Sequence, residues 1–193
     1  MINFTSKDRY DFADLQRLVE VLRAPGGCPW DRAQTHASIR MNFIEETYED
    51  MSRRAADLIA AQLIVDPAST LGLATGSTPI GLYADLVEDF QADRISFEQV
   101  TTFNLDEYRG LSPEHDQSYR YFMQKNLFDH VDIDPEATSV PDGANPDAQA
   151  ACESYEQAIS EAGGIDLQLL GIGHDGHIGF NEPCDHFPVI THE

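Results

Sequence analysis

Two kinds of hydrophobic pattern follow one another along the chain. In the first third, apolar residues recur at the spacing of an amphipathic helix, which predicts one helix over residues 10–23. A second helical pattern over 35–65 indicates one long helix or two helices with a bend. Proline and glycine in the stretch 24–27 end the first helix, and residues 28–31 are predicted to be a loop. We therefore expect an α-helical segment at the start of the chain.

From about residue 70 onward, short apolar runs alternate with helical patterns. The predicted strands cover residues 71–74, 100–104 and 165–172, and the predicted helices cover 80–90, 119–130 and 148–162. The proline-rich stretch 132–147 is predicted to be a surface loop. Strands that alternate with helices are typical of an open parallel sheet with crossover helices, so we expect an α/β fold preceded by the helical segment.

Charge narrows the range of partners. The 193 residues carry 12 basic and 34 acidic side chains, a formal charge of −22. Such a field repels phosphate backbones and anionic lipid, so we expect neither nucleic acid nor a membrane as a partner. No apolar run is long enough to span a bilayer, and the first residues lack the order of a signal peptide. The three cysteines, Cys28, Cys152 and Cys184, lack metal-ligand spacing and fit a reducing cytoplasm.

Polar clusters follow the predicted strands, at the sheet edge where open parallel sheets bind ligands. After the first strand come Thr75, Gly76, Ser77 and Thr78. This stretch predicts either a phosphate-binding turn or an ordinary capped strand-to-helix turn, and it lacks the lysine of a Walker loop. Asp106 and Glu107 follow the second strand. They are candidates for proton transfer, with a solvated turn or helix N-terminal acids as the alternative.

A third cluster follows the last predicted strand and contains His174, Asp175, His177 and Glu182. A histidine flanked by carboxylates has what a general base needs, because the carboxylates orient and polarise the imidazole. A zinc site through the two histidines is an alternative, but a third ligand is not obvious. A polar loop with incidental histidines is the remaining interpretation.

Residues 48–183 resemble the glucosamine-6-phosphate deaminase family, also called the isomerase family. The resemblance is carried by residues 51–57, 71–79, 102–108 and 171–183. It implies a Rossmann-like sheet and the conversion of glucosamine 6-phosphate, a small sugar phosphate, to fructose 6-phosphate and ammonium. It further implies a cytoplasmic homo-oligomer that needs no metal or organic cofactor. The related phosphogluconolactonases are expected to share the fold but to lack the Phe-Asn-Leu-Asp-Glu-Tyr segment at 103–108, which favours the deaminase.

The resemblance also implies a role for each motif residue. Asp106 is the expected base that moves a proton from C2 to C1 of the substrate. His177 is expected to open the sugar ring, with Asp175 and Glu182 orienting its imidazole. The turn formed by Thr75, Gly76, Ser77 and Thr78 is expected to hold part of the sugar phosphate.

Residues 12–49 resemble instead the start of MazG-type nucleotide pyrophosphohydrolases. Residues 22–31 and 34–36 carry this resemblance together with Glu45, Glu46 and Glu49, which lie along one helix and offer the oxygen ligands that Mg²⁺ prefers. The second acidic pair of that family does not follow. We therefore expect a helical fragment over 1–49 and a truncated deaminase-like domain over 50–193. The alternatives are a Mg²⁺-dependent nucleoside triphosphate pyrophosphohydrolase and an inactive product of fusion or truncation.

Overall fold

The computed structural model describes residues 12–183 and 190–193; within them, the side chains of residues 12–15, 30–31 and 36–46 are not described. The chain divides into two compact units, Met1–Tyr48 and Glu49–Glu193, and the boundary falls inside one long helix. In the described part, no helix is long and apolar enough to cross a bilayer.

The first unit is helical. Helix α1 (Phe12–Arg23) ends in a turn in which the Gly27 N–H donates to the Ala24 carbonyl at 2.9 Å. A short helix, α2 (Pro29–Ala33), follows where the sequence predicted a loop. That prediction is wrong because Pro29 suits the first position of a helix, where its missing N–H costs nothing. Helix α3 (His36–Val65) comes next as a single helix of 30 residues.

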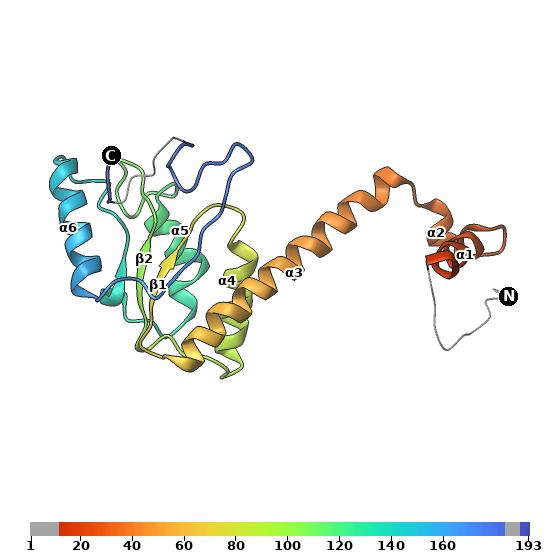
Figure 1. The fold of residues 1–193 in the computed structure, drawn as a ribbon, viewed down its shortest axis with the longest axis horizontal. Helices are drawn as coiled ribbons and strands as arrows, with labels where there is room; N and C mark the ends of the chain where they lie inside the picture. The colour runs from red at the N-terminus through yellow and green to blue at the C-terminus, as the bar shows by residue number, and fades with distance from the viewer. Residues whose placement is uncertain (1–11, 184–189) are drawn as a thin grey trace. The chain divides into compact units, whose positions relative to one another are not determined.

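In its described residues, the second unit is built on a four-stranded sheet, and Figure 1 labels its two longest strands, β1 and β2. Its strands are β1 (Thr70–Leu73), β2 (Thr101–Asn104), β3 (Thr138–Ser139) and β4 (Leu167–Gln168), in the spatial order β3-β2-β1-β4. All three neighbouring pairs are parallel. The connections carry helices α4 (Ile80–Gln91), α5 (Tyr119–Asn126) and α6 (Ala148–Glu161) and 3₁₀ turns η1 (Phe128–His130) and η2 (Pro135–Ala137). The structure thus confirms the predicted parallel α/β fold.

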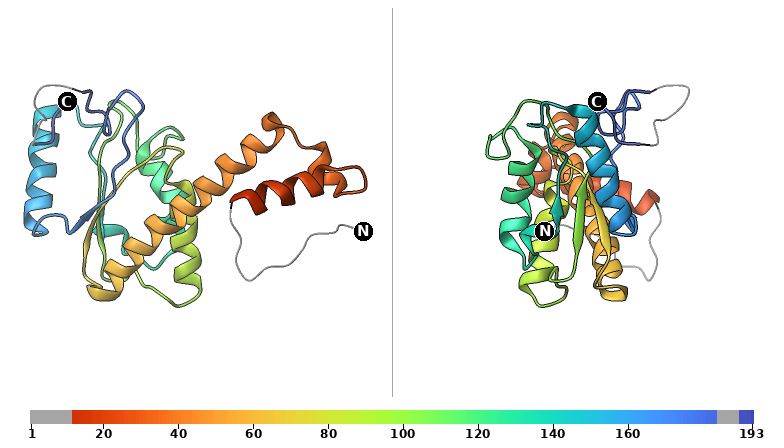
Figure 2. Two further views of the ribbon diagram at one scale, coloured as in Figure 1. Left: turned by 45° about the vertical axis from the view of Figure 1, so that its right-hand side comes forward. Right: turned by 90° about the vertical axis from the view of Figure 1, so that its left-hand side faces the viewer.

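Helices cover both faces of the sheet. The main hydrophobic core joins α3, α4 and α5 to β1; its members include Ile59, Leu63, Leu71, Leu73, Tyr83, Leu86 and Met123. Helix α6 lies on the opposite side of the sheet from α4 and α5 (Figure 2). There the Tyr155 hydroxyl donates to the Asn104 carbonyl at 2.7 Å, and its ring meets Phe103 edge to face. Parallel strands are normally covered in this way because both of their faces are apolar.

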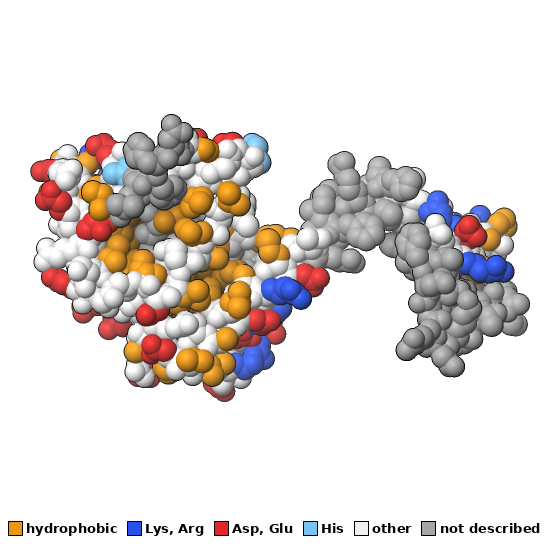
Figure 3. Space-filling view, viewed as in Figure 1, with side chains coloured by type: hydrophobic (Ala, Val, Ile, Leu, Met, Phe, Trp, Pro, Cys, Tyr) orange, Lys and Arg blue, Asp and Glu red, His pale blue; other side chains and the backbone are white. Residues whose placement is uncertain are grey.

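Two strand predictions need correction. Strand β3 lies inside the predicted loop 132–147, where η2, capped by Asp134, leads the chain into a two-residue pairing with β2. Strand β4 spans two residues, although the apolar run predicted eight. Beyond it, Leu170 and Ile172 are 50% and 75% exposed. Figure 3 shows hydrophobic side chains gathered on the face of the second unit between α3 and α6.

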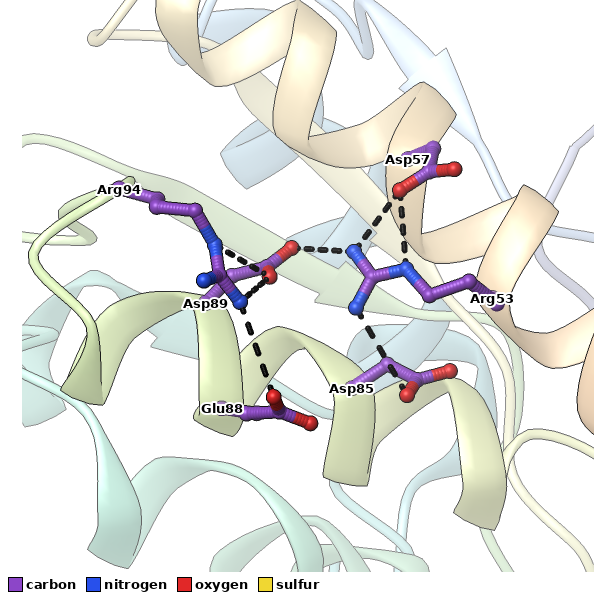
Figure 4. A network of polar contacts seen from close by, with 6 residues as sticks. All are labelled: Arg53, Asp57, Asp85, Glu88, Asp89 and Arg94. Atoms are coloured by element: carbon purple, nitrogen blue, oxygen red, sulfur yellow. Dashed lines mark hydrogen bonds and ion pairs between the residues drawn. The ribbon is translucent and has the colours of Figure 1, made fainter.

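A network of ion pairs ties α3 to α4 within the second unit (Figure 4). Asp89 of α4 is 3% exposed and accepts hydrogen bonds from two guanidinium groups, those of Arg53 and Arg94. Arg53 also bonds to Asp57 on its own helix at 2.9 Å and approaches Asp85 at 3.7 Å. The network joins the helices that precede and follow β1 in the chain.

The strand order determines where a ligand is expected. From β1 the chain steps outward to β2 and β3, and it then returns to place β4 on the other side of β1. The order therefore reverses between β1 and β4. Ligands of open α/β sheets bind at such a reversal, outside the carboxyl ends of the strands. The loops that follow β1 and β4 contain two of the three polar clusters predicted from sequence.

Candidate active site

A cavity of about 620 Å³ opens at the carboxyl ends of β1, β2 and β4. We call it the front cavity. Its lining includes Thr75, Thr78, Asp106, Tyr119, His177 and Phe180. Members of all three predicted polar clusters therefore meet in one place. None of the described side chains that line the cavity belongs to lysine or arginine.

The turn after β1 brings hydroxyl groups to the front cavity. Gly76 has φ of +98°, a left-handed conformation that glycine adopts without strain. Pro79 precedes α4 and accepts the first bond of that helix from the Tyr83 N–H at 2.9 Å. Of the four predicted residues, Thr75 and Thr78 line the cavity, whereas Gly76 and Ser77 are exposed in the same turn.

The Asp106-Glu107 pair has two different roles. The Glu107 carboxylate accepts the backbone N–H groups of Tyr119 and Arg120 at 2.9 and 3.0 Å, so it caps the N-terminus of α5. For Glu107, the alternative of a helix N-terminal acid is therefore confirmed. Asp106 instead lines the front cavity and also a second cavity of about 650 Å³.

The environment of Asp106 favours its protonated form. Burial is the largest effect and, with the adjacent charge of Glu107, raises the pKa of Asp106 to about 6; a hydrogen bond from the Phe180 backbone N–H opposes the rise. A carboxylate is a weak base at its ordinary pKa and becomes a stronger one as its pKa approaches neutrality. Asp106 is thus a good candidate for proton abstraction near pH 7.

In the loop after β4, His177 is paired with one of its two predicted partners. Its ring Nδ1 lies 2.6 Å from Asp175 Oδ1, and its backbone N–H bonds to the same oxygen. Donation from the His177 backbone N–H and then from its ring lowers the pKa of Asp175. Glu182 is exposed, and among the described contacts no hydrogen bond joins it to His177. The role expected for Glu182 stays a prediction.

A side chain at residue 173 would meet the His177 ring. A Cβ on Gly173 would lie 2.3 Å from Cε1 and 2.4 Å from Nδ1 of the imidazole. His174 is exposed in this loop. Among the side chains that are described, no three His, Cys, Asp or Glu residues gather as a metal site would require. Of the expected Mg²⁺ ligands, Glu49 is exposed, and the side chains of Glu45 and Glu46 lie outside the described residues.

The sequence analysis missed an aromatic cluster beside Asp106, which consists of Tyr108, Tyr119 and Phe180. Ring centroids lie 4.9 Å apart for Tyr108 and Tyr119, 5.1 Å for Tyr108 and Phe180, and 5.7 Å for the stacked pair Tyr119 and Phe180. Burial raises the pKa of Tyr119, and its hydroxyl bonds to the side chains of Tyr108 and Thr75. These rings come from the loop after β2, the first residue of α5 and the loop after β4, so no local sequence pattern groups them.

Comparison with known proteins gives a consistent result. A family model described as glucosamine-6-phosphate isomerases/6-phosphogluconolactonase matches residues 42–179. A glucosamine-6-phosphate deaminase of Halothermothrix orenii is 56% identical over 150 residues, which are 78% of this chain and 62% of that protein. Glucosamine-6-phosphate deaminase 2 of Bacillus subtilis is 54% identical over 149 residues, covering 77% of this chain and 60% of that protein.

Solved structures agree. One described as a monomeric glucosamine-6-phosphate deaminase has a TM-score of 0.69 and 46% identity, covering 70% of this chain and 56% of its own. A 6-phosphogluconolactonase of Thermotoga maritima has a TM-score of 0.58 and 27% identity, covering 69% of this chain and 59% of its own. The chain spans 59% to 65% of the length of the curated relatives that it matches. With the family model matching well over half of its residues, this chain belongs to the glucosamine-6-phosphate isomerase/6-phosphogluconolactonase family.

Proposed function

We propose that this chain catalyses the isomerisation and deamination of glucosamine 6-phosphate to fructose 6-phosphate and ammonium. The observation that carries the proposal is the shared cavity: a carboxylate with a raised pKa, an Asp-bonded histidine and a hydroxyl-bearing turn all line it. Its volume, about 620 Å³, lies within the range of small-molecule sites. The names of the family relatives support the same reaction.

Asp106 acts as the base of the reaction. In the open-chain sugar the C1 carbonyl makes the C2 proton acidic, so a carboxylate with a pKa of about 6 is well matched to remove it. Asp106 then returns the proton to C1, and the electron pair of the C2–H bond ends in the new C1–H bond. The C1 oxygen takes up a proton and becomes a hydroxyl, while the nitrogen at C2 gives up a proton and becomes an imine. One water molecule then hydrolyses this imine to a ketone with release of ammonia.

His177 opens the sugar ring by proton transfer. Because Asp175 is an acceptor, the Nδ1 of His177 carries the proton of their 2.6 Å hydrogen bond. The other ring nitrogen, Nε2, is then the atom that exchanges a proton with the substrate oxygens. Glu182 is proposed as a second group that orients this histidine when substrate is bound.

We propose that the turn after β1 binds the phosphate of the substrate. Thr75 and Thr78 offer hydroxyl donors, and the start of α4 adds backbone N–H groups and the positive end of a helix dipole. We further propose that residues 50–193 form the catalytic domain, that residues 1–49 form a separate helical one, and that the chain works in the cytoplasm as a homo-oligomer. One solved relative is described as monomeric, so size-exclusion chromatography with light scattering decides the oligomeric state directly.

Turnover in deuterium oxide tests the proposed reaction. The purified chain is incubated with glucosamine 6-phosphate, and proton NMR follows the product. We expect fructose 6-phosphate with deuterium at C1, because the carboxyl of Asp106 exchanges its proton with solvent between abstraction and delivery. A His177→Asn variant is expected to lose turnover, whereas Glu98→Gln, an exposed residue outside the described cavity linings, keeps it. Absence of fructose 6-phosphate from the parent reaction would contradict the proposal.

A further inference from the structure

Phe180 contacts Asp106 through its backbone. Its N–H donates to the Asp106 carboxylate. The preceding residue, Gly179, has φ of +59°, and a Cβ there would lie 3.0 Å from Asp106 Oδ2 and 2.6 Å from Leu105 Cδ2. The loop after β4 is therefore seated directly on the carboxylate, and only a residue without a side chain fits at 179.

The Phe180 ring has no place in the hydrophobic core. It is 52% exposed, yet it stacks on Tyr119 at an interplanar angle of 26° and makes a tilted ring contact with Tyr108. Aromatic pairs of this kind contribute about 0.5–1.5 kcal/mol each beyond the area that they bury. Core packing does not account for the position of this ring, but its two aromatic neighbours do.

Those neighbours are themselves anchored around the front cavity. The Glu107 carboxylate holds the Tyr119 N–H at 2.9 Å and the Tyr108 N–H at 2.8 Å. The Tyr119 hydroxyl bonds to Thr75, which belongs to the proposed phosphate-binding turn. The aromatic cluster thus connects the loop of Asp106, the turn after β1 and the loop that carries His177.

We propose that Phe180 is a positioning residue for Asp106: its ring, held by Tyr108 and Tyr119, keeps its own N–H on the carboxylate and excludes water from it. The inference rests on the proposed function, in which Asp106 is the base. Among the described residues, the titratable groups that act on Asp106 or share a cavity with it are Glu107, Tyr108, Arg109, Tyr119, Asp142, Cys152, Tyr155, His177, His192 and Glu193.

Removing the Phe180 ring weakens two effects that act on the pKa of Asp106 in opposite directions. Burial raises the pKa of Asp106 and is the largest effect, whereas the Phe180 N–H bond lowers it. Loss of the ring admits water and weakens both. Because burial dominates, the pKa of Asp106 is expected to fall toward its ordinary value in Phe180→Ala, and the carboxylate becomes a weaker base.

The experiment compares the parent chain with Phe180→Ala, Phe180→Leu and Phe180→Tyr, with Tyr121→Ala as a matched control. Tyr121 is an aromatic residue of α5 that is 38% exposed and lines none of the described cavities. Carbon-13 NMR of labelled aspartate gives the pKa of Asp106, assigned through Asp106→Asn, and an ammonia assay gives kcat/KM from pH 5 to 9. Circular dichroism confirms that each variant is folded.

In Phe180→Ala we expect the pKa of Asp106 to fall by about one unit and kcat/KM at neutral pH to fall about tenfold, with the acidic limb moved to lower pH. Phe180→Tyr restores parent values, and Phe180→Leu, which keeps the bulk but not the stacking, lies between them. If Phe180→Ala does not fold, the comparison of Phe180→Leu with Phe180→Tyr tests the inference instead.

Unchanged pKa and kcat/KM in Phe180→Ala, or an equal shift in Tyr121→Ala, overturns the inference. The NMR titration needs no turnover, which separates the two proposals. A parent chain that releases no ammonia but shows the pKa change refutes the proposed function alone. An active chain whose Asp106 pKa does not depend on Phe180 refutes the positioning role alone.

Discussion

Replacement of Asp89 by asparagine removes the buried centre of the α3–α4 ion-pair network while keeping its shape. Asp89 is 3% exposed, and two guanidinium groups bond to it, with Arg53 Nη2 at 2.5 Å and Arg94 Nε at 2.9 Å. Breaking a buried ion pair by removing one partner costs about 3–5 kcal/mol. An asparagine oxygen still accepts one of these bonds, and the Arg53 and Arg94 side chains are 36% and 51% exposed, so solvent screens part of the effect. We therefore expect Asp89→Asn to lower the free energy of unfolding by about 2 kcal/mol.

Asp57→Asn is the matched control. Asp57 bonds to the same guanidinium, Arg53, at 2.9 Å, but its side chain is 62% exposed. An exposed pair contributes about 0.2–1 kcal/mol, because solvent screens it. The assay is urea and thermal unfolding followed by circular dichroism at 222 nm. A loss of about 2 kcal/mol corresponds to a drop of roughly 6 °C in Tm for a chain of this size.

The pH dependence gives a second check on the Asp89 effect. Burial by itself raises the pKa of Asp89, but the hydrogen bonds from Arg53 and Arg94 outweigh it and lower the pKa overall. A carboxyl with a lowered pKa in the folded state stabilises the protein above its unfolded pKa, and this stabilisation is lost as pH falls through the folded value. The gap between parent and Asp89→Asn is therefore expected to shrink from pH 7 to pH 3. Equal losses in Asp89→Asn and Asp57→Asn, both below 1 kcal/mol, would refute this account of the network.

Three further predictions concern the site. Turnover should fall about tenfold per pH unit below about pH 6, because Asp106 must be ionised to act as a base. A flat rate between pH 5 and 7 in a stopped ammonia assay would exclude Asp106 as the base. Asp106→Asn should raise the free energy of unfolding at pH 8 by about 1 kcal/mol, discounted for solvent screening, because a carboxyl with a raised pKa destabilises the folded state once it is ionised. Urea unfolding at pH 5 and pH 8 tests this prediction, and a loss of stability at pH 8 would contradict it. Gly173→Ala should reduce kcat at least tenfold, because its Cβ would displace the His177 ring; an unchanged kcat would show that the ring can move without loss.

Features that depend on local pattern were predictable from the sequence. Helices α4 and α6 were predicted within two residues of both ends, since their apolar periodicity and the residues around their ends are local. The meeting of Thr75, Asp106 and His177 at one cavity was also predictable, because parallel strands bring their carboxyl ends to one edge.

Features that depend on tertiary contact were not predictable from the sequence. Strand β3 is two residues long and is defined only by its parallel pairing with β2. The apolar run 165–172 predicts a long strand, yet β4 pairs with β1 over two residues and the chain then leaves the sheet. The aromatic cluster joins residues 108, 119 and 180, whose grouping follows from the fold and not from any spacing.

Ammonia release from glucosamine 6-phosphate, measured for the purified chain beside its Asp106→Asn variant, tests the central claim most directly. Asparagine keeps the size of the side chain but cannot accept the C2 proton. We predict that the parent chain releases ammonia and that the variant is slower by at least about a hundredfold, the usual contribution of a positioned general base. A variant that retains the parent rate, or a folded parent chain that releases no ammonia, would contradict the account.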